Sequence, residues 1–209
     1  MIKKIGVINY GAGNLMSISK ALQFLGLDVE IIHRKTKKNY DMLILPGVGN
    51  FESAMNTLKK YDLDEYIINF VSKQRPLLGI CLGIQLLFEK SEEAKNTLGL
   101  GLLKGEVKKF RVKNLPVPHM CWNLVNFVKE EKILLERIKK QEFFYFVHSY
   151  YPKPYKKEYI FGTTKYASVE FCSMIVKENI VATQFHLEKS GQEGLKLLRN
   201  IINYFNKLN

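Results

Sequence analysis

A cysteine between two glycines is the strongest chemical signal in the sequence. Cys81 is the centre of the run GICLG at 79–83, which follows an apolar segment at 77–80 and precedes a helix-like segment at 84–88. A nucleophile flanked by glycines between a strand and a helix is typical of a nucleophile elbow, because the strained turn leaves no room for bulky neighbours. The pattern predicts that Cys81 is a nucleophile.

The expected surroundings of Cys81 would make it reactive. The N-terminus of the following helix favours the thiolate over the thiol. The backbone N–H of Leu82 can donate to an oxyanion that develops on the substrate. The alternative is that Cys81 is a small buried hydrophobic residue, as many lone cysteines are. The flanking glycines in this context favour the nucleophile.

A histidine and a glutamate near the C-terminus are candidates for the base and its orienting group. His186 and Glu188 follow the apolar run 180–185. If the strand continues, alternate residues point the same way, so the carboxylate can orient the imidazole. His186 would then activate Cys81, and Glu188 would hold His186. A surface His and Glu at a strand end is the alternative, which the elbow elsewhere in the chain disfavours.

Two glycine-containing loops follow predicted strands. The run PGVGNF at 46–51 can aim backbone N–H groups at an anion or a carbonyl oxygen, although a simple strand-to-helix turn explains it equally well. The run GAGN at 11–14 lacks the third glycine of a dinucleotide fingerprint, so we reject a nicotinamide-cofactor site there.

The elements that must position these residues change character along the chain. In the first half, strand-like runs at 4–9, 29–32, 41–45 and 77–80 alternate with helical periodicity at 15–25, 51–60 and 63–72. Asn14 is a plausible N-cap of the first helix and Gly26 its stop. Short strand-like runs dominate the second half, at 107–112, 123–128, 143–150, 159–164, 172–177 and 180–185, before a helix opened by a capping box at 190–193. This order predicts one α/β domain over 1–209, with a mostly parallel sheet, helices on both faces and antiparallel additions.

Composition limits the partners and cofactors. The 209 residues are 46% hydrophobic and 25% charged, which is ordinary for a globular protein, and the three cysteines form no CxxC pair. We therefore expect no disulfide framework and no metal. The net charge of +12 comes from lysines spread along the chain with no aromatic-interleaved motif, so we expect no nucleic acid. With no apolar run of membrane-spanning length and no signal peptide, we expect a cytoplasmic protein and no membrane partner.

The order of several motifs resembles one known family. The runs LPGVG at 45–49, GICLGIQLL at 79–87, PHM at 118–120, WN at 122–123, YFVHSY at 145–150, QFH at 184–186 and EKSG at 188–191 cover nearly the whole chain. In this order they resemble the class I glutamine amidotransferases. The PHM and FVHSY segments point to the branch that serves imidazole glycerol phosphate synthase.

The resemblance implies a flavodoxin-like fold and a glutaminase that needs no cofactor. Cys81 would attack the side-chain amide of glutamine, and His186 would protonate the departing ammonia and then activate water. It further implies an oxyanion strand of Gly47, Val48 and Gly49 beside Leu82, and a glutamine pocket lined by Gln85, His148, Ser149 and Tyr150. His148 would act largely through its backbone.

The resemblance also implies a partner. Members of this branch pass ammonia to a (β/α)8-barrel cyclase subunit that makes imidazole glycerol phosphate and AICAR in histidine biosynthesis. A further hypothesis is that ligand on the partner reshapes the 46–49 loop and so raises a weak glutaminase activity. The residues that fall at the expected heterodimer contact are Asn14, Met120, Trp122, Asn123, Tyr145 and Lys189. For Trp122 and Tyr145, composition alone favours core packing instead.

Two residues depart from the family pattern. Cys121 stands where glycine is usual, and Leu187 stands where proline is usual. Leu187 should leave the triad usable, since neither acid nor base changes. Cys121 lies beside the expected partner contact, so it leaves open a paralogous glutaminase that supplies ammonia for amidino groups on a surface sugar.

Overall fold

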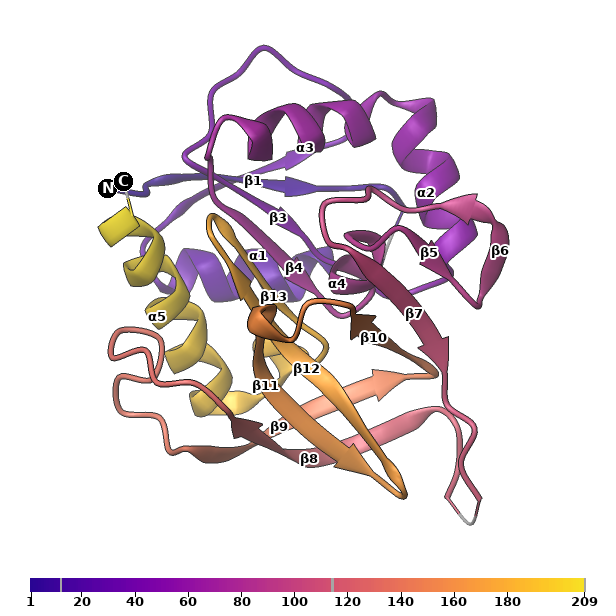
Figure 1. Cartoon of the computed structure of the whole chain (residues 1–209). Helices are drawn as coiled ribbons and strands as arrows, with labels where there is room; N and C mark the ends of the chain where they lie inside the picture. Colours follow the sequence, from indigo (N-terminus) through magenta and orange to yellow (C-terminus); the bar gives the residue numbers. More distant parts are fainter. Residues whose placement is uncertain (12, 114, 209) are drawn as a thin grey trace.

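The fold is a large mixed sheet with helices on both faces and a small second sheet at one end (Figure 1). The computed structural model describes residues 1–11, 13–113 and 115–208. The nine-stranded sheet has the order β2-β1-β3-β4-β13-β12-β11-β8-β9. Its parallel part comprises β1 (Lys4–Ile8), β2 (Asp28–Ile32), β3 (Met42–Leu45), β4 (Leu77–Ile80) and β13 (Ile180–Thr183). The predicted parallel core is confirmed.

The antiparallel additions are also confirmed, and they continue the same sheet beyond β13. They are β12 (Val169–Lys177), β11 (Ile160–Tyr166), β8 (His119–Phe127) and β9 (Gln141–His148). Because β13 pairs in parallel with β4 and antiparallel with β12, it joins the two halves of the sheet. The segment that follows β13 therefore lies beside the turn that follows β4, which brings residues 184–188 close to Cys81.

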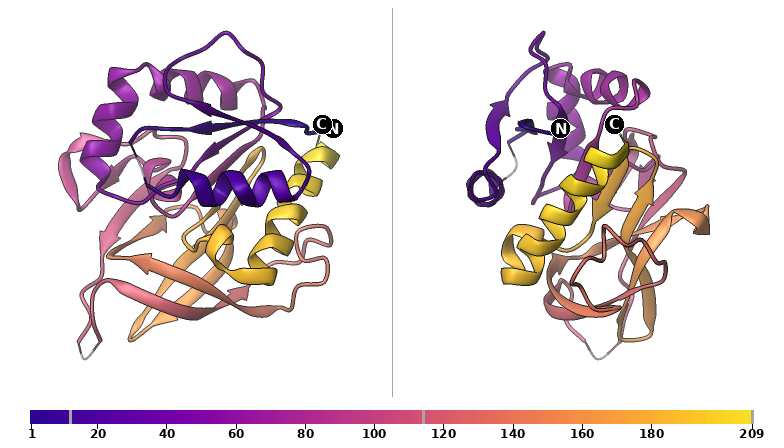
Figure 2. Two further views of the ribbon diagram at one scale, coloured as in Figure 1. Left: turned by 180° about the vertical axis from the view of Figure 1, so that it is seen from behind. Right: turned by 90° about the vertical axis from the view of Figure 1, so that its left-hand side faces the viewer.

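Helices cover both faces of the parallel part (Figures 1 and 2). On one face, α1 (Leu15–Phe24) and α5 (Gly191–Leu208) pack on side chains such as Val7 and Ile44. On the other, α2 (Phe51–Lys60), α3 (Leu63–Ser72) and the short α4 (Leu82–Leu86) pack on Leu43 and Leu45. Alternate residues of β3 thus enter opposite cores, which explains why this strand is apolar throughout.

One predicted strand is in fact two. The run 143–150 was expected to be continuous, but β9 ends at His148 and β10 (Tyr150–Pro154) begins after Ser149. The chain bends at Ser149 and leaves the large sheet, because β10 pairs with β7 (Gly105–Lys109) in the second sheet. That sheet, of order β10-β7-β5-β6, also contains β5 (Lys90–Ser91) and β6 (Ala94–Leu98), which have no clear apolar alternation and were not predicted.

The ends of α1 lie at the predicted residues, whereas the predicted capping interactions of α1 and α5 are not formed. Gly26 follows α1 with a φ of +81°, as expected of a residue that stops a helix. Asn14 occupies the N-cap of α1, but its φ is +72° and its side chain makes no capping bond. The capping box before α5 was wrong: the Ser190 hydroxyl donates to the His186 carbonyl oxygen, and the Glu193 carboxylate accepts from Lys196 instead. Two short 3-10 turns, η1 (Lys157–Tyr159) and η2 (Leu187–Lys189), complete the described elements.

Candidate active site

Cys81 occupies a strained turn between β4 and α4. Its φ of +54° and ψ of −106° lie outside the regions that non-glycine residues usually adopt. A Cβ on Gly83 would lie 1.8 Å from the carbonyl oxygen of Leu45, so glycine is required there, and a Cβ on Gly79 would lie 3.1 Å from the backbone of Gly83, which is an unusually tight contact. The turn has the geometry of a nucleophile elbow, with Cys81 at the carboxyl end of the parallel strands.

His186 and Glu188 meet as expected, but not on a strand. Strand β13 ends at Thr183, and the two residues lie at the start of the 3-10 turn η2. The turn folds Glu188 back onto the ring, so that Nδ1 of His186 donates to Oε1 of Glu188 at 2.7 Å. The His186 amide also donates to the Tyr145 carbonyl oxygen at 3.0 Å, which fixes the backbone of the turn to β9. The predicted strand alternation was wrong, and the pairing that it was meant to explain is present.

The surroundings of His186 favour its positively charged, imidazolium form. Burial by itself lowers the pKa of His186, but the charge of Cys81 and then the hydrogen bond and charge of Glu188 raise it to about 10. Among the described residues, Nε2 of His186 has no hydrogen-bond partner of regular geometry, so the influence of Cys81 is chiefly electrostatic. A thiolate on Cys81 and an imidazolium on His186 stabilise each other, which is the charge state that a cysteine nucleophile requires.

Asn14 also bonds to this carboxylate. Its side-chain amide donates to Oε1 of Glu188 at 2.5 Å, so that one oxygen accepts from both Asn14 and His186. Asn14 was predicted at the partner contact, and the structure places it against the Glu188 carboxylate. Its left-handed backbone conformation turns the side chain away from the helix end that it was expected to cap.

The expected oxyanion donors are not free. The backbone amide of Leu82 donates to the Gly47 carbonyl oxygen at 3.2 Å. Val48 and Gly49 line the same cavity as Cys81, and Gly49 has a φ of +134°, which glycine tolerates and other residues rarely adopt. The strand predicted to bind an oxyanion is therefore beside Leu82, with a carbonyl rather than an N–H group facing it.

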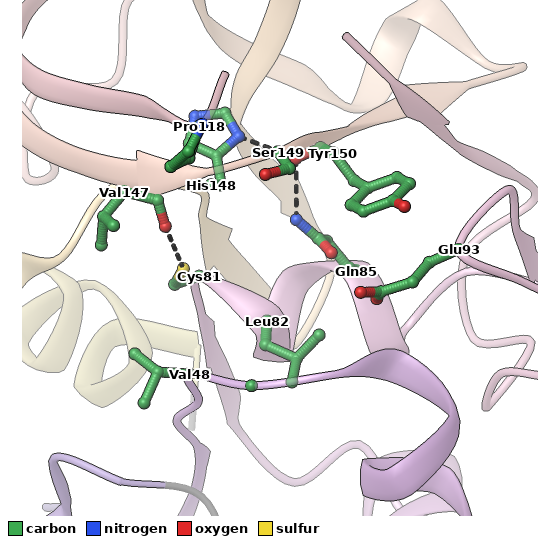
Figure 3. A pocket seen from close by; sticks show the side chains of 11 residues that line it. Val48, Cys81, Leu82, Gln85, Glu93, Pro118, Val147, His148, Ser149 and Tyr150 are labelled. Atoms are coloured by element: carbon green, nitrogen blue, oxygen red, sulfur yellow. Dashed lines mark hydrogen bonds between the residues drawn. The ribbon is translucent and has the colours of Figure 1, made fainter. Parts of the chain in front are cut away.

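A cavity of about 250 Å³ opens in front of Cys81 (Figure 3). Seven of the residues predicted for substrate or oxyanion binding line it, and Gly47 does not. The lining comprises Val48, Gly49, Cys81, Leu82, Gln85, Glu93, Pro118, Val147, His148, Ser149 and Tyr150. Its size and mixed polarity suit a molecule as small as one amino acid.

Glu93 is a residue of this cavity that the sequence did not identify. Its Oε2 accepts from the amide of Phe51 at 2.9 Å, which anchors the side chain at the cavity wall (Figure 3). Glu93 follows β5 in a short segment without periodicity, so no sequence pattern distinguishes it from its neighbour Glu92. A carboxylate at this place can bind an ammonium group.

Gln184 was part of a recognised motif but had no assigned role. Its Nε2 lies 3.8 Å from Sγ of Cys81, and its Oε1 accepts from Nε2 of Gln85 at 3.0 Å. The same Gln85 nitrogen donates to the Tyr150 carbonyl oxygen at 2.9 Å (Figure 3). These amides connect the nucleophile to the far wall of the cavity and fix the orientation of Gln85.

The residues predicted for partner contact on β8 divide between its two faces, and the others lie on β9, in η2 and before α1. Met120 and Trp122 are exposed, by 62% and 52%, so core packing of Trp122 is excluded. Tyr145 lies opposite Trp122 in the β8–β9 ladder, with ring centroids 6.2 Å apart, and Lys189 is exposed. Asn123 lies on the other side of the strand, where its amide donates to the Lys165 carbonyl oxygen at 3.0 Å.

The two departures from the family pattern differ in burial, and neither is an exposed residue. Cys121 alternates with Met120 and Trp122 along β8, so it shares a side with the fully buried His119, and burial raises the pKa of its thiol. Leu187 is fully buried in the core under α5.

Within residues 1–11, 13–113 and 115–208, no group of three or more His, Cys, Asp or Glu side chains is arranged to hold a metal ion. In the same part of the chain, no helix combines the length and the apolar character needed to cross a bilayer.

Comparison with known proteins gives a consistent result. A family model described as glutamine amidotransferase class-I matches residues 6–204. The chain is 48% identical over 199 residues to imidazole glycerol phosphate synthase subunit HisH of Methanocaldococcus jannaschii, covering 95% of this chain and 98% of that protein. It is 46% identical over 202 residues to subunit HisH 1 of Methanococcus maripaludis, covering 95% and 98%.

Solved structures share the fold at lower identity. A chain of PurLQS from Thermotoga maritima superposes with a TM-score of 0.75 at 18% identity, covering 98% of this chain and 99% of that chain. A glutamine amidotransferase from Thermotoga maritima superposes with a TM-score of 0.68 at 17% identity, covering 99% of this chain and 84% of that chain. At these identities the likeness concerns the fold alone.

Proposed function

The chain belongs to the class I glutamine amidotransferases, and from this we propose that it is the glutaminase subunit that supplies ammonia for imidazole glycerol phosphate synthesis in histidine biosynthesis. The observation that carries the proposal is the buried Cys81–His186–Glu188 arrangement beside an amino-acid-sized cavity. The similarity to HisH subunits over nearly the full length of both chains supports the pathway.

In the proposed reaction the Cys81 thiolate attacks the side-chain amide carbon of glutamine. A C–S bond forms and the carbonyl oxygen becomes an oxyanion. His186 gives its Nε2 proton to the amide nitrogen, the C–N bond breaks and ammonia leaves. Neutral His186 then takes a proton from water, the hydroxide attacks the thioester, and glutamate departs as the thiolate is restored. Glu188 stays ionised and orients the ring throughout.

The cavity offers complementary groups to glutamine. We assign the Glu93 carboxylate to the α-ammonium group, because it is a carboxylate on the cavity wall beyond Gln85 (Figure 3). We assign the α-carboxylate to the backbone of Ser149 and Tyr150, which line the cavity beside Gln85. Bound in this way, the side chain of glutamine extends toward Sγ.

The partner in this proposal is a (β/α)8-barrel cyclase subunit that forms a heterodimer with the chain. Exposed Met120 and Trp122 suit a protein contact, because aromatic residues and methionine are enriched in such interfaces. Together with Tyr145 and Lys189 they lie on the side of β8 and β9 that also leads to η2 and the triad. Ammonia released at Cys81 would therefore leave close to the partner.

The bond between Leu82 and Gly47 supports control by that partner. While Leu82 donates to Gly47, it cannot donate to an oxyanion. We propose that docking and ligand binding on the partner turn the 46–49 loop, which frees the Leu82 amide and raises turnover. The sugar-amidination alternative rested on the departures at Cys121 and Leu187, and the similarity to HisH subunits over nearly the full chain favours the histidine pathway instead.

Two measurements test the proposal. The chain, expressed with its cyclase subunit, should restore growth without histidine to an auxotroph that lacks its own glutaminase subunit, and Cys81→Ala should not. The purified complex should release glutamate from glutamine, faster with ligand on the cyclase, and should release an equal amount of ammonia when no acceptor substrate is present. Glutamate release without restored growth would reassign the pathway, and no release at all would reject the glutaminase.

A further inference from the structure

Two buried histidines outside the triad face each other across β8 and β9. His119 and His148 are paired in the ladder, and Nδ1 of His119 lies 2.9 Å from Nε2 of His148. Their exposed fractions are 0% and 6%. His119 belongs to the PHM segment that distinguishes this branch, yet the chemistry described above gives it no role.

The donor and the acceptor can be assigned for each hydrogen bond around this pair. Nδ1 of His148 lies 2.7 Å from the Tyr150 carbonyl oxygen, which can only accept, so Nδ1 carries the proton. Nε2 of a neutral His148 must then accept, and Nδ1 of His119 must donate to it. Nε2 of His119 is left to accept from the Asn123 amide at 3.1 Å.

The surroundings keep both rings neutral. Phe110, Phe146 and Phe171 pack around the two imidazoles, with ring centroids between 4.9 and 6.1 Å away. Burial lowers the pKa of His119 to about 4. Burial, with the charges of His119 and His186, lowers the pKa of His148 to about 3 against the opposing effect of the Tyr150 carbonyl. Each ring therefore has one donor and one acceptor, and both are used.

The inner end of this chain of bonds is the substrate turn. The Tyr150 carbonyl oxygen accepts from His148 and from Gln85 (Figure 3). Ser149, which lies between His148 and Tyr150 in the sequence, is the bend where the chain passes from β9 to β10. His148, Ser149 and Tyr150 all line the cavity. A bend that leaves one sheet for another has few ladder bonds of its own, so the His148–Tyr150 bond constrains it directly.

At the outer end of the same chain of hydrogen bonds, Asn123 joins β8 to β11. Asn123 donates to His119 and to the Lys165 carbonyl oxygen, and its own oxygen accepts from the Leu124 amide at 2.8 Å. The β8–β11 ladder is limited to Gly162–Phe127 and Thr163–Asn126, so Asn123 bridges the strands beyond their paired residues. The opposite side of the same strand presents exposed Met120 and Trp122.

We propose that His119 is a positioning residue that, through His148, holds the glutamine-binding turn 148–150 in place and ties it to the strand that carries the exposed partner residues. The proposal rests on the proposed glutaminase function and deepens it. The proposal assigns a role to the PHM segment, because His119 Nδ1 donates a hydrogen bond that an apolar packing residue cannot donate.

A pair of substitutions at one position tests this role. His119→Phe fills the aromatic pocket but removes the donor, whereas His119→Asn places an amide N–H near the former Nδ1. In the complex with the cyclase, His119→Phe should raise KM for glutamine about tenfold, with kcat within about twofold of wild type. His119→Asn should restore most of the loss. The Kd for glutamine, measured by calorimetry in a Cys81→Ala background, should follow KM.

Thr164→Val is the matched control. Thr164 is buried and donates to Ser173 Oγ at 2.9 Å between β11 and β12, away from the cavity lining. It should lose stability but keep the wild-type KM. Unchanged KM in His119→Phe, or equal KM values in the Phe and Asn variants, would overturn the inference. If His119→Phe does not fold, Asn123→Leu tests the same inference. We expect Asn123→Leu to raise KM for glutamine about threefold, and an unchanged KM would contradict the inference. A wild-type complex without glutaminase activity would instead reject the proposed function.

Discussion

The backbone amide of Leu82 donates a hydrogen bond to the Gly47 carbonyl oxygen, at an N···O distance of 3.2 Å. Leu82 follows the nucleophile directly, so the group best placed to stabilise an oxyanion is satisfied by the protein itself. The next carbonyl back along the loop, that of Pro46, accepts from the buried Tyr10 hydroxyl at 2.5 Å. Two hydrogen bonds therefore oppose any turn of the 46–49 loop, and both can be altered by substitution.

Tyr10→Phe removes one of these bonds and keeps the ring. Burial, and to a lesser degree the charge of Cys81, raises the pKa of Tyr10, so its hydroxyl remains a donor at neutral pH. A buried hydrogen bond contributes about 1 kcal/mol, so we expect partner-free glutaminase to rise about fivefold. If the liganded cyclase turns the loop as proposed, the activity of that complex should change little. Thr164→Val is the control, and lower partner-free activity in Tyr10→Phe would show that the hydroxyl supports the turned loop instead.

Gly47→Ala tests the packing between the loop and Tyr10. A Cβ at this position would lie 1.8 Å from Tyr10 Oη and 3.0 Å from Cβ of Leu82. Overpacking of this kind costs about 1–3 kcal/mol, which urea unfolding would measure. In a Tyr10→Phe background the cost should be smaller, because the closest atom is gone. Additive losses in the double variant would mean that the two residues do not meet in solution.

Cys81→Ala separates glutamine hydrolysis from synthesis. The substitution removes Sγ but leaves the elbow backbone, so glutamate release should fall below detection. With ammonium salt supplied, the complex should still make product at the rate of the wild type under the same conditions. The stability of the variant should stay within about 1 kcal/mol, since the lost atom is small. Residual glutamate release at the wild-type rate would remove Cys81 from the mechanism.

The sequence predicted the parts of the site that depend on neighbouring residues. The elbow around Cys81 needs glycines two residues away on each side, and the contacts of Gly79 and Gly83 explain both. His186 and Glu188 are also two residues apart, so their pairing could be expected even though the turn that makes it is η2 and not a strand. Local steric requirements of this kind leave a visible pattern.

The contacts that the sequence did not predict join distant segments. Asn14 reaches Glu188, Gln85 reaches Gln184, and Glu93 reaches Phe51 only after the sheet order has been formed. The break at Ser149 was missed for a related reason. Aromatic residues dominate 143–150 and favour a strand, and the bend depends on pairing of β10 with β7, far away in the chain.

Glu188→Gln should change the pH dependence more than the maximum rate. Burial lowers the pKa of His186, whereas Cys81 and then Glu188 raise it, to about 10 in balance. The imidazolium is populated below that pKa, so kcat/KM should decline on the alkaline side near pH 10 in the wild type. Loss of the carboxylate charge lowers the pKa of His186 and moves this decline to lower pH. The amide oxygen can still accept from Nδ1, so the maximum should fall less than in Cys81→Ala. An unmoved alkaline limit, or complete inactivation equal to that of Cys81→Ala, contradicts an orienting role for Glu188.

The neutral His119–His148 pair should make the protein sensitive to acid. The folded-state pKa values of about 4 and about 3 lie below the value of about 6.5 for an unfolded histidine. Between pH 6.5 and 4 the unfolded chain binds protons at these positions that the folded protein does not, so the free energy of unfolding should fall as pH falls through this window. His186 has the opposite shift and is protonated in both states there, so it adds no slope. His119→Asn removes one of the two proton sites and should reduce the slope by up to about 1.4 kcal/mol per pH unit. Urea unfolding of wild type, His119→Asn and Thr164→Val from pH 7 to 4 measures how the free energy of unfolding depends on pH. Equal slopes for wild type and His119→Asn would mean that His119 is protonated in the folded protein.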